Sequence, residues 1–122
     1  MPKDIFFVVN VDWYLLSHRK EIALAAQQNG FRVTIVAHDT GKRGEIEKLG
    51  FRFINLPRIR SMQTMRHEFK ILIFIYSLYK YQKPDIVHHV GLKLTLYGTA
   101  MARLTNVKSI VNAVSGLGIF FS

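Results

Sequence analysis

The sequence of 122 residues contains no cysteine. This absence excludes disulfide bridges and thiolate metal sites, and it favours a reducing compartment. Long apolar runs are also lacking: the longest, residues 71–78, falls far short of the roughly 18 residues needed to span a membrane. The apolar start of the chain is interrupted by Asp4, Asn10 and Asp12, unlike a signal peptide. We therefore expect a single cytoplasmic domain.

Acidic residues are scarce, with 8 Asp and Glu against 17 Lys and Arg, for a net charge of +9. Such a charge favours anionic partners such as nucleotides, nucleic acid, acidic lipid or phosphorylated substrates, and it is equally compatible with a soluble protein that has a basic surface. The aromatic residues cluster in predicted strands and one apolar helix instead of alternating with Lys and Arg. This pattern disfavours nucleic-acid binding, which only the charge supports.

Glycine is missing from the segment between Asn10 and Arg19, directly after the first apolar run. A nicotinamide dinucleotide fingerprint and a P-loop both need glycines there, because backbone N–H groups must approach phosphate closely. Asp39 stands where a dinucleotide fold would place a ribose-binding acid. Without the glycines, we interpret Asp39 as a turn residue.

Alternating strand and helix patterns occupy the whole chain. Predicted strands cover residues 5–9, 31–37, 51–56, 85–90 and 107–114, and predicted helices cover residues 18–28, 44–49, 65–83 and 94–104. Residues 10–17 are predicted to form a loop, with Ser17 as the N-cap of the first helix. This order predicts the α/β class: a Rossmann-like parallel β-sheet with helices on both faces, binding ligands at the carboxyl ends of its strands. Because no helix follows the last strand, we expect a truncated domain.

Two neighbouring histidines, His88 and His89, lie near the end of the fourth predicted strand. Since successive strand side chains face opposite ways, we expect one to face the core and the other the cleft. Lys93 begins the next predicted helix, where a lysine suits an anion better than it suits the helix dipole; the alternative is a solvated loop lysine. No third ligand has suitable spacing for zinc, so no metal site is expected.

The segment of residues 58–83 is basic at its ends and apolar and aromatic in its middle. Apolar residues nearly encircle the predicted helix, so one face packs on the sheet and the rest needs another cover. A basic aromatic helix can lie on an anionic membrane surface. A fully buried helix with basic ends is the alternative, and the sequence leaves both open.

Five motifs in order carry a family resemblance. They are residues 7–10 with 13–19, 47–51, 83–88, 97–98 with 100–104, and 112–118. The motifs are spread along essentially the whole chain, which resembles the N-terminal domain of family 4 (group 1) GT-B glycosyltransferases, especially those that build bacterial surface polysaccharides. The resemblance implies that residues 1–122 form a Rossmann-like acceptor-side domain, the N-terminal half of a GT-B fold. A C-terminal nucleotide-sugar-binding domain is then missing, whether in cis or on a partner chain.

The resemblance also implies an activity and a site. A sugar would pass from a nucleotide-sugar to a lipid-linked or saccharide acceptor, with retention of configuration, without a required metal or cofactor, at the inner face of a bacterial membrane. His88 would orient the sugar near the reacting centre. The substrate-binding residues would be Asn10, Trp13, His18, Arg19, His89, Lys93, Ser115, Gly116 and Gly118. The chain departs from the family pattern in two places, with Asp12-Trp13 in the first loop and Val90 where a second histidine often stands.

An alternative reading makes this chain a non-catalytic subunit of a split glycosyltransferase. In that case the basic apolar helix would recruit a catalytic partner to the membrane instead of lining an acceptor site.

Overall fold

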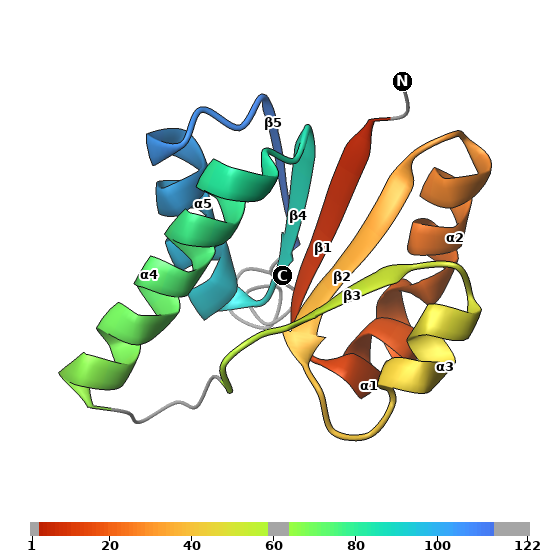
Figure 1. Cartoon of the computed structure of the whole chain (residues 1–122), viewed down its shortest axis with the longest axis horizontal. Helices are drawn as coiled ribbons and strands as arrows, with labels where there is room; N and C mark the ends of the chain where they lie inside the picture. Colours follow the sequence, from red (N-terminus) through yellow and green to blue (C-terminus); the bar gives the residue numbers. More distant parts are fainter. Residues whose placement is uncertain (1–2, 59–63, 114–122) are drawn as a thin grey trace, which may run out of the picture.

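The computed structural model describes residues 3–58 and 64–113 of the chain. Its centre is a five-stranded sheet in the order β3-β2-β1-β4-β5, in which every neighbouring pair is parallel (Figure 1). The strands are β1 (Asp4–Val11), β2 (Arg32–His38), β3 (Arg52–Asn55), β4 (Ile86–Val90) and β5 (Ser109–Ala113). The helical segments are α1 (Asp12–Tyr14), η1 (Leu15–Arg19), α2 (Lys20–Gln28), α3 (Arg43–Lys48), α4 (Met65–Gln82) and α5 (Leu92–Leu104). The predicted Rossmann-like α/β fold is confirmed.

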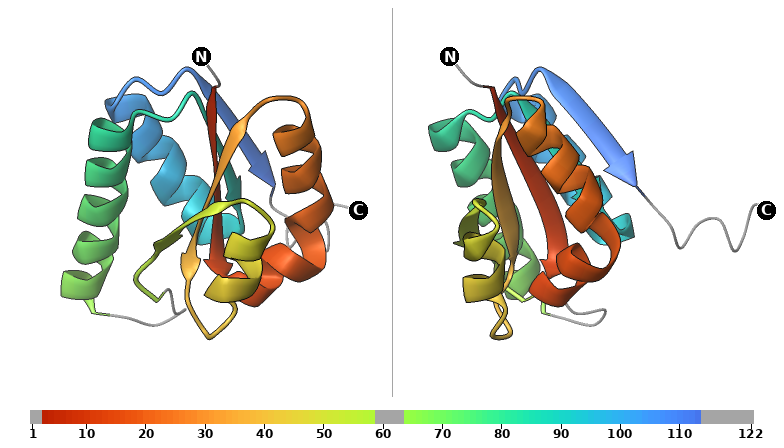
Figure 2. Two further views of the ribbon diagram at one scale, coloured as in Figure 1. Left: turned by 45° about the vertical axis from the view of Figure 1, so that its right-hand side comes forward. Right: turned by 90° about the vertical axis from the view of Figure 1, so that its right-hand side faces the viewer.

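Helices cover both faces of the sheet, which gives the domain three layers (Figure 2). The segments α1 to α3 cover one face, and α4 and α5 cover the other. Because side chains alternate along a strand, β1 serves both cores: Phe6 and Val8 pack with the α4–α5 layer, while Phe7 and Val9 pack with the opposite layer. Strands buried on both faces explain the continuous apolar runs of the sequence.

The predicted loop over residues 10–17 is wrong. The strand β1 continues to Val11, and helical structure then runs from Asp12 to Gln28 through the π-helical segment η1. Ser17 lies inside this run, and its hydroxyl donates to the carbonyl of Tyr14 at 3.3 Å instead of capping a helix. The error arises because the first helical turn is held by tertiary contacts of Asp12, which local sequence patterns do not reveal.

The long helix α4 agrees closely with the predicted span. Thr64 caps its start, since the Thr64 hydroxyl accepts a hydrogen bond from the His67 N–H at 3.3 Å. The helix ends where Lys83 adopts a left-handed conformation (φ 49°) before Pro84, which cannot continue a helix. One face packs on the sheet through Ile71, Ile75, Leu78 and Tyr79.

The opposite face of α4 is open to solvent. Met65 is 73% exposed, Phe69 is 56% exposed and Ile73 is 63% exposed. These three residues recur every four positions and therefore form one stripe along the helix, which we call the α4 stripe. Within the described residues, α4 is therefore not a fully buried helix.

Candidate functional site

The sheet order reverses direction between β1 and β4. From β1 the chain first builds outward to β2 and β3, and it then returns to add β4 and β5 on the other side. In open parallel sheets, ligands bind beside the carboxyl ends of the two strands that flank such a reversal. Asn10 lies exposed near the end of β1, and His88 lies two residues before the end of β4. The structure therefore brings these two predicted residues to the expected edge.

His88 and His89 point to opposite faces of β4, as predicted. His88 lies on the face covered by α1 to α3, where its ring is 5.2 Å from that of Phe7. Only 9% of its surface is exposed, and its buried Nε2 atom has no hydrogen-bond partner among the described residues. Burial lowers the pKa of His88, and the nearby Arg19 guanidinium lowers it further. The imidazole is therefore neutral near pH 7.

The π-helical segment η1 brings His18 and Arg19 to the same edge. The His18 ring stacks on Tyr14 with centroids 4.2 Å apart, and its Nδ1 lies 2.7 Å from the Ser17 hydroxyl. Arg19 ends the segment, and its buried Nε atom has no hydrogen-bond partner within residues 3–58 and 64–113. Single turns of π-helix occur frequently at functional sites. Here the turn places a second unpartnered nitrogen near His88.

Asp12 is a buried residue of this edge that sequence analysis did not assign to the site. Its carboxylate accepts hydrogen bonds from the backbone N–H groups of Trp13, Thr40 and Lys42 and from the Thr40 hydroxyl, at 2.5–2.9 Å. Burial by itself would raise the pKa of Asp12, but these hydrogen bonds outweigh it and leave the pKa lowered. Asp12 thus ties the start of α1 to the loop after β2.

This tie positions Trp13 at the surface of the same edge. Its indole is 52% exposed and lies 6.2 Å from the Tyr14 ring. An acidic residue directly after a strand, in a segment without glycine, was the one sequence signal that could have revealed the tie. In place of a glycine loop that wraps phosphate, the chain has a rigid turn that displays an aromatic ring.

The position of His89 does not agree with its predicted contact with substrate. It is fully buried on the α4–α5 side of the sheet, and both ring nitrogens are engaged. Its Nδ1 lies 2.9 Å from Asn112 Oδ1, which can only accept, so Nδ1 carries the proton. Nε2 then accepts a hydrogen bond from the Tyr79 hydroxyl at 2.7 Å. His89 is a satisfied core residue, closed off from the sheet edge.

Lys93 also differs from its predicted role. Its ammonium group lies 2.7 Å from a carboxylate oxygen of Glu68 on α4, and the Tyr97 hydroxyl donates to the other oxygen. Lys93 therefore joins α5 to α4, and its charge is already balanced by Glu68. The sequence did not indicate that Glu68 pairs with Lys93, and this pairing determines the role of Lys93. Three further predicted residues, Ser115, Gly116 and Gly118, lie outside the described residues.

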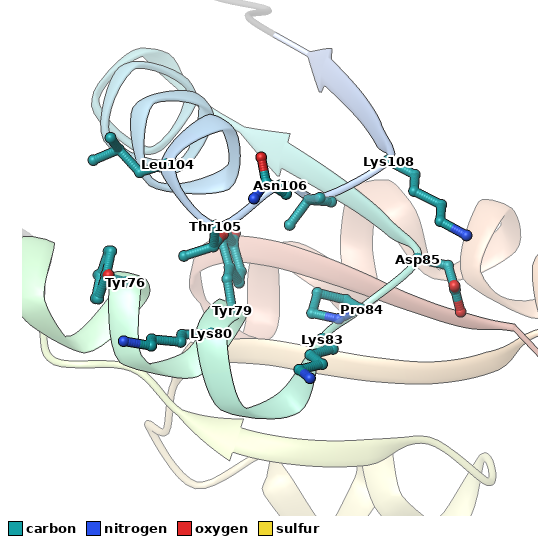
Figure 3. Close-up of a pocket in the computed structure, with 11 residues that line it drawn as sticks. Tyr76, Tyr79, Lys80, Lys83, Pro84, Asp85, Leu104, Thr105, Asn106 and Lys108 are labelled. Carbon is teal, nitrogen blue, oxygen red and sulfur yellow. The ribbon is translucent and has the colours of Figure 1, made fainter.

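No metal cluster marks the carboxyl edge among the described residues. Within residues 3–58 and 64–113, no three His, Asp or Glu side chains converge as metal ligands. A cavity lies at the opposite, amino edge of the sheet, between the ends of α4 and α5 (Figure 3). None of its lining residues belongs to the predicted site.

Comparison with solved structures supports the fold. Acinetobacter baumannii MurG superposes with a TM-score of 0.70 at 19% identity, covering 91% of this chain and 35% of MurG. A glycosyltransferase from Rickettsia africae gives a TM-score of 0.68 at 13% identity, covering 98% of this chain and 33% of its own. The C-terminal domain of the PF1911 hydrogenase from Pyrococcus furiosus gives 0.66 at 18% identity, covering 93% of this chain and 91% of that domain. At these identities the likeness concerns the fold alone.

Comparison by sequence identifies the family. No curated protein matches the chain. The chain spans about a third of the length of the two glycosyltransferases described above. The family model described as glycosyl transferase 4-like matches residues 4–122. The chain therefore belongs to the glycosyl transferase 4-like family.

Proposed function

We propose that this chain is the acceptor-side domain of an enzyme that transfers a sugar from a nucleotide-sugar to a lipid-linked or saccharide acceptor. The proposed setting is synthesis of a cell-surface polysaccharide in a bacterium. A second domain, in cis or on a partner chain, would hold most of the nucleotide-sugar. Retention of configuration and independence from metal are parts of the proposal that rest on the family resemblance.

The observation that carries the proposal is the pair of unpartnered nitrogens at the carboxyl edge. Buried polar atoms are almost always hydrogen-bonded, so His88 Nε2 and Arg19 Nε, which have no partner in the part of the chain that the structure describes, call for an explanation. Both belong to the edge where open parallel sheets bind ligands. A sugar hydroxyl or phosphate oxygen at this edge would satisfy them.

The residues divide into two roles in this proposal. A neutral His88 would hydrogen-bond and orient the transferred sugar, while Arg19 would balance negative charge on the departing nucleotide. The exposed Trp13 ring and the stacked Tyr14–His18 pair offer flat aromatic surfaces for the acceptor. Asn10, exposed beside them, can donate and accept hydrogen bonds with acceptor hydroxyls.

The α4 stripe supports a membrane-bound acceptor. Arg66 and Lys70 lie exposed beside Met65, Phe69 and Ile73, so the open face of α4 combines apolar and basic side chains. Such a face suits the surface of an anionic membrane. Within the described residues, no helix is both long and apolar enough to span a bilayer. We propose peripheral binding at the inner face of the membrane, with α4 in contact with lipid.

The test replaces His88 in the full-length enzyme, with nucleotide-sugar donors and the membrane fraction as the source of acceptor. We expect His88→Gln to lower kcat by about 100-fold or more, in the range for loss of one hydrogen bond made to the reacting group. His67→Gln is the matched control, because the His67 ring, whose Nε2 lies 2.9 Å from the Arg58 carbonyl oxygen, has no role in the proposed site. Transfer by His88→Gln at the wild-type rate would refute the role of His88.

Two further measurements test the remaining parts of this proposal. Proton NMR of the first product reports whether the anomeric configuration is retained, and the rate in excess chelator reports any need for metal. An inverted product or loss of activity in chelator would overturn the corresponding part. The alternative of a recruiting subunit stays a prediction, and the intact mass of the native protein in its source cells tests it.

A further inference from the structure

A cavity of about 460 Å³ opens at the amino edge of the sheet, far from the proposed catalytic edge (Figure 3). The ends of α4 and α5 and the starts of β4 and β5 enclose it. Its volume falls within the range of small-molecule sites. Its lining includes Lys80, Lys83 and Lys108, together with Tyr76, Asp85 and Asn106. Nothing in the proposed transfer reaction uses this cavity.

The lining has an excess of positive charge. None of its three lysines forms an ion pair within the part of the chain that the structure describes. The one acidic residue of the lining, Asp85, turns a carboxylate oxygen toward the backbone N–H of Asp4 at 2.8 Å. Lys80 lies over the Tyr76 ring, 5.6 Å from its centroid. Three lysines and only one acidic residue therefore line the cavity.

Lysines near a helix C-terminus can serve simply to balance the exposed carbonyl groups. At the end of α5, most of the exposed carbonyl groups already accept hydrogen bonds from other groups. The Thr105 hydroxyl donates to the carbonyls of Met101 and Ala102, and the backbone N–H groups of Thr105, Asn106 and Val107 bond carbonyls of the last turn. At α4, the Lys83 N–H bonds the Tyr79 carbonyl. The lysine side chains are thus left available for a ligand.

The backbone of the cavity rim adds a second observation. Lys83 and Asn106 are the two non-glycine residues with positive φ in the described structure, at 49° and 63°. Asn tolerates this conformation, but lysine adopts it at a cost of about 1 kcal/mol or more. Glycine would avoid that cost at the end of α4. Lys83 thus lines the cavity at the expense of backbone strain.

We propose that this cavity binds a phosphate group carried by a small anionic molecule or a lipid headgroup. Lys80, Lys83 and Lys108 would surround the phosphate oxygens, and the Asn106 amide would donate a further hydrogen bond. The α4 stripe leads directly to the cavity, because Tyr76 and Lys80 follow Ile73 on the same face of the helix. A lipid whose headgroup occupies the cavity could thus lie beside the apolar stripe. The proposal does not rest on the glycosyltransferase activity.

The experiment compares two charge-matched variants of the chain. The pocket variant carries Lys80→Gln, Lys83→Gln and Lys108→Gln, and the control variant carries Lys20→Gln, Lys42→Gln and Lys48→Gln on the other side of the sheet. Each is titrated with sn-glycerol 3-phosphate and followed by amide chemical shifts in proton–nitrogen NMR spectra. Each is also sedimented with vesicles of phosphatidylcholine, with and without phosphatidylglycerol. Far-UV circular dichroism confirms that both variants are folded.

In the native chain we expect the ligand to shift the amide signals of Lys83, Asn106 and Lys108. We expect the pocket variant to bind at least about tenfold more weakly than the control variant. If glycerol 3-phosphate shifts these amide signals, a small soluble phosphate compound is sufficient for binding to the cavity. Pocket-dependent binding that appears only with phosphatidylglycerol vesicles identifies the lipid headgroup. If neither probe binds, or if the control variant loses binding to the same extent, the proposal is overturned. Because the readout is equilibrium binding, a failure here leaves the test of sugar transfer unaffected.

Discussion

Gly98 shows how one missing side chain supports the buried network of His89. A Cβ atom built at Gly98 would lie 2.2 Å from the His89 ring. The ring cannot easily move aside, because it is hydrogen-bonded to Tyr79 and to Asn112, and Asn112 is itself bonded to Thr99. The glycine in α5 is therefore required by packing, although glycine disfavours a helix by about 1 kcal/mol relative to alanine.

The substitution Gly98→Ala tests this contact. We expect a loss of about 1–3 kcal/mol in the free energy of unfolding, since overpacking outweighs the gain in helix propensity. Gly44→Ala in α3 is the matched control, because nothing lies within 4 Å of the added Cβ, and it should be neutral or slightly stabilising. Urea unfolding of both variants provides the measurement. Equal stability of the two would mean that the ring is not held in place.

Single residues also show where sequence patterns stop being informative. Strand alternation predicted that His88 and His89 face opposite sides, and the structure confirms it. It could not say which one reaches the carboxyl edge, because that depends on which layer of helices covers each face. The partners of Asp12 and Glu68 could not be predicted, because Thr40 and Lys93 lie 28 and 25 residues away from them in the sequence.

At the scale of elements, α4 has two apolar faces with different surroundings. One face is buried on the sheet by Ile71, Ile75 and Leu78, and the other presents the α4 stripe to solvent. Packing within the described structure explains only the first face. Contact with a membrane would explain the second, and the neighbouring Arg66 and Lys70 would add attraction to anionic lipid.

Polar substitutions on the α4 stripe test membrane contact. We expect Phe69→Ser with Ile73→Ser to weaken binding to vesicles containing phosphatidylglycerol by about tenfold or more, because two large apolar side chains no longer enter the lipid. Cosedimentation at low salt measures the binding, and added salt should weaken it further. The control, Ile22→Ser with Val111→Ser, changes exposed apolar residues elsewhere on the surface. Loss of binding in both variants, or in neither, would contradict a specific role for α4.

At the scale of the whole molecule, buried histidines link stability to pH. Burial lowers the pKa of His89 to about 4 from an ordinary value of 6.5, and the hydrogen bond to Asn112 offsets this only in part. The unfolded chain thus binds more protons than the folded chain between these two values. Stability contributed by the neutral ring is complete above pH 6.5 and is lost as the pH falls toward 4. His88, whose pKa is also lowered by burial, acts in the same direction.

We expect the free energy of unfolding to fall between pH 6.5 and pH 4 by up to about 1.4 kcal/mol per pH unit for each such histidine. Asp4 and Asp12 act below this window, since stability gained from a lowered carboxyl pKa is lost only in stronger acid. In His89→Gln the slope within the window should become shallower, even though the variant starts less stable. Urea unfolding at several pH values measures both slopes. Identical slopes would mean that His89 does not carry the effect.

The sequence by itself determined the layers of this protein. The order of strands and helices follows from local periodicity and from turn residues such as Pro84, which act over a few positions and can be read directly along the chain. Tertiary structure decided the rest: the strand order that sets β1 beside β4, the helical turn held by Asp12, and the separation of the two histidines. It also decided that Lys93 meets Glu68 and that three lysines surround one cavity. These outcomes depend on side chains far apart in sequence meeting in space, and such contacts leave no local pattern to read.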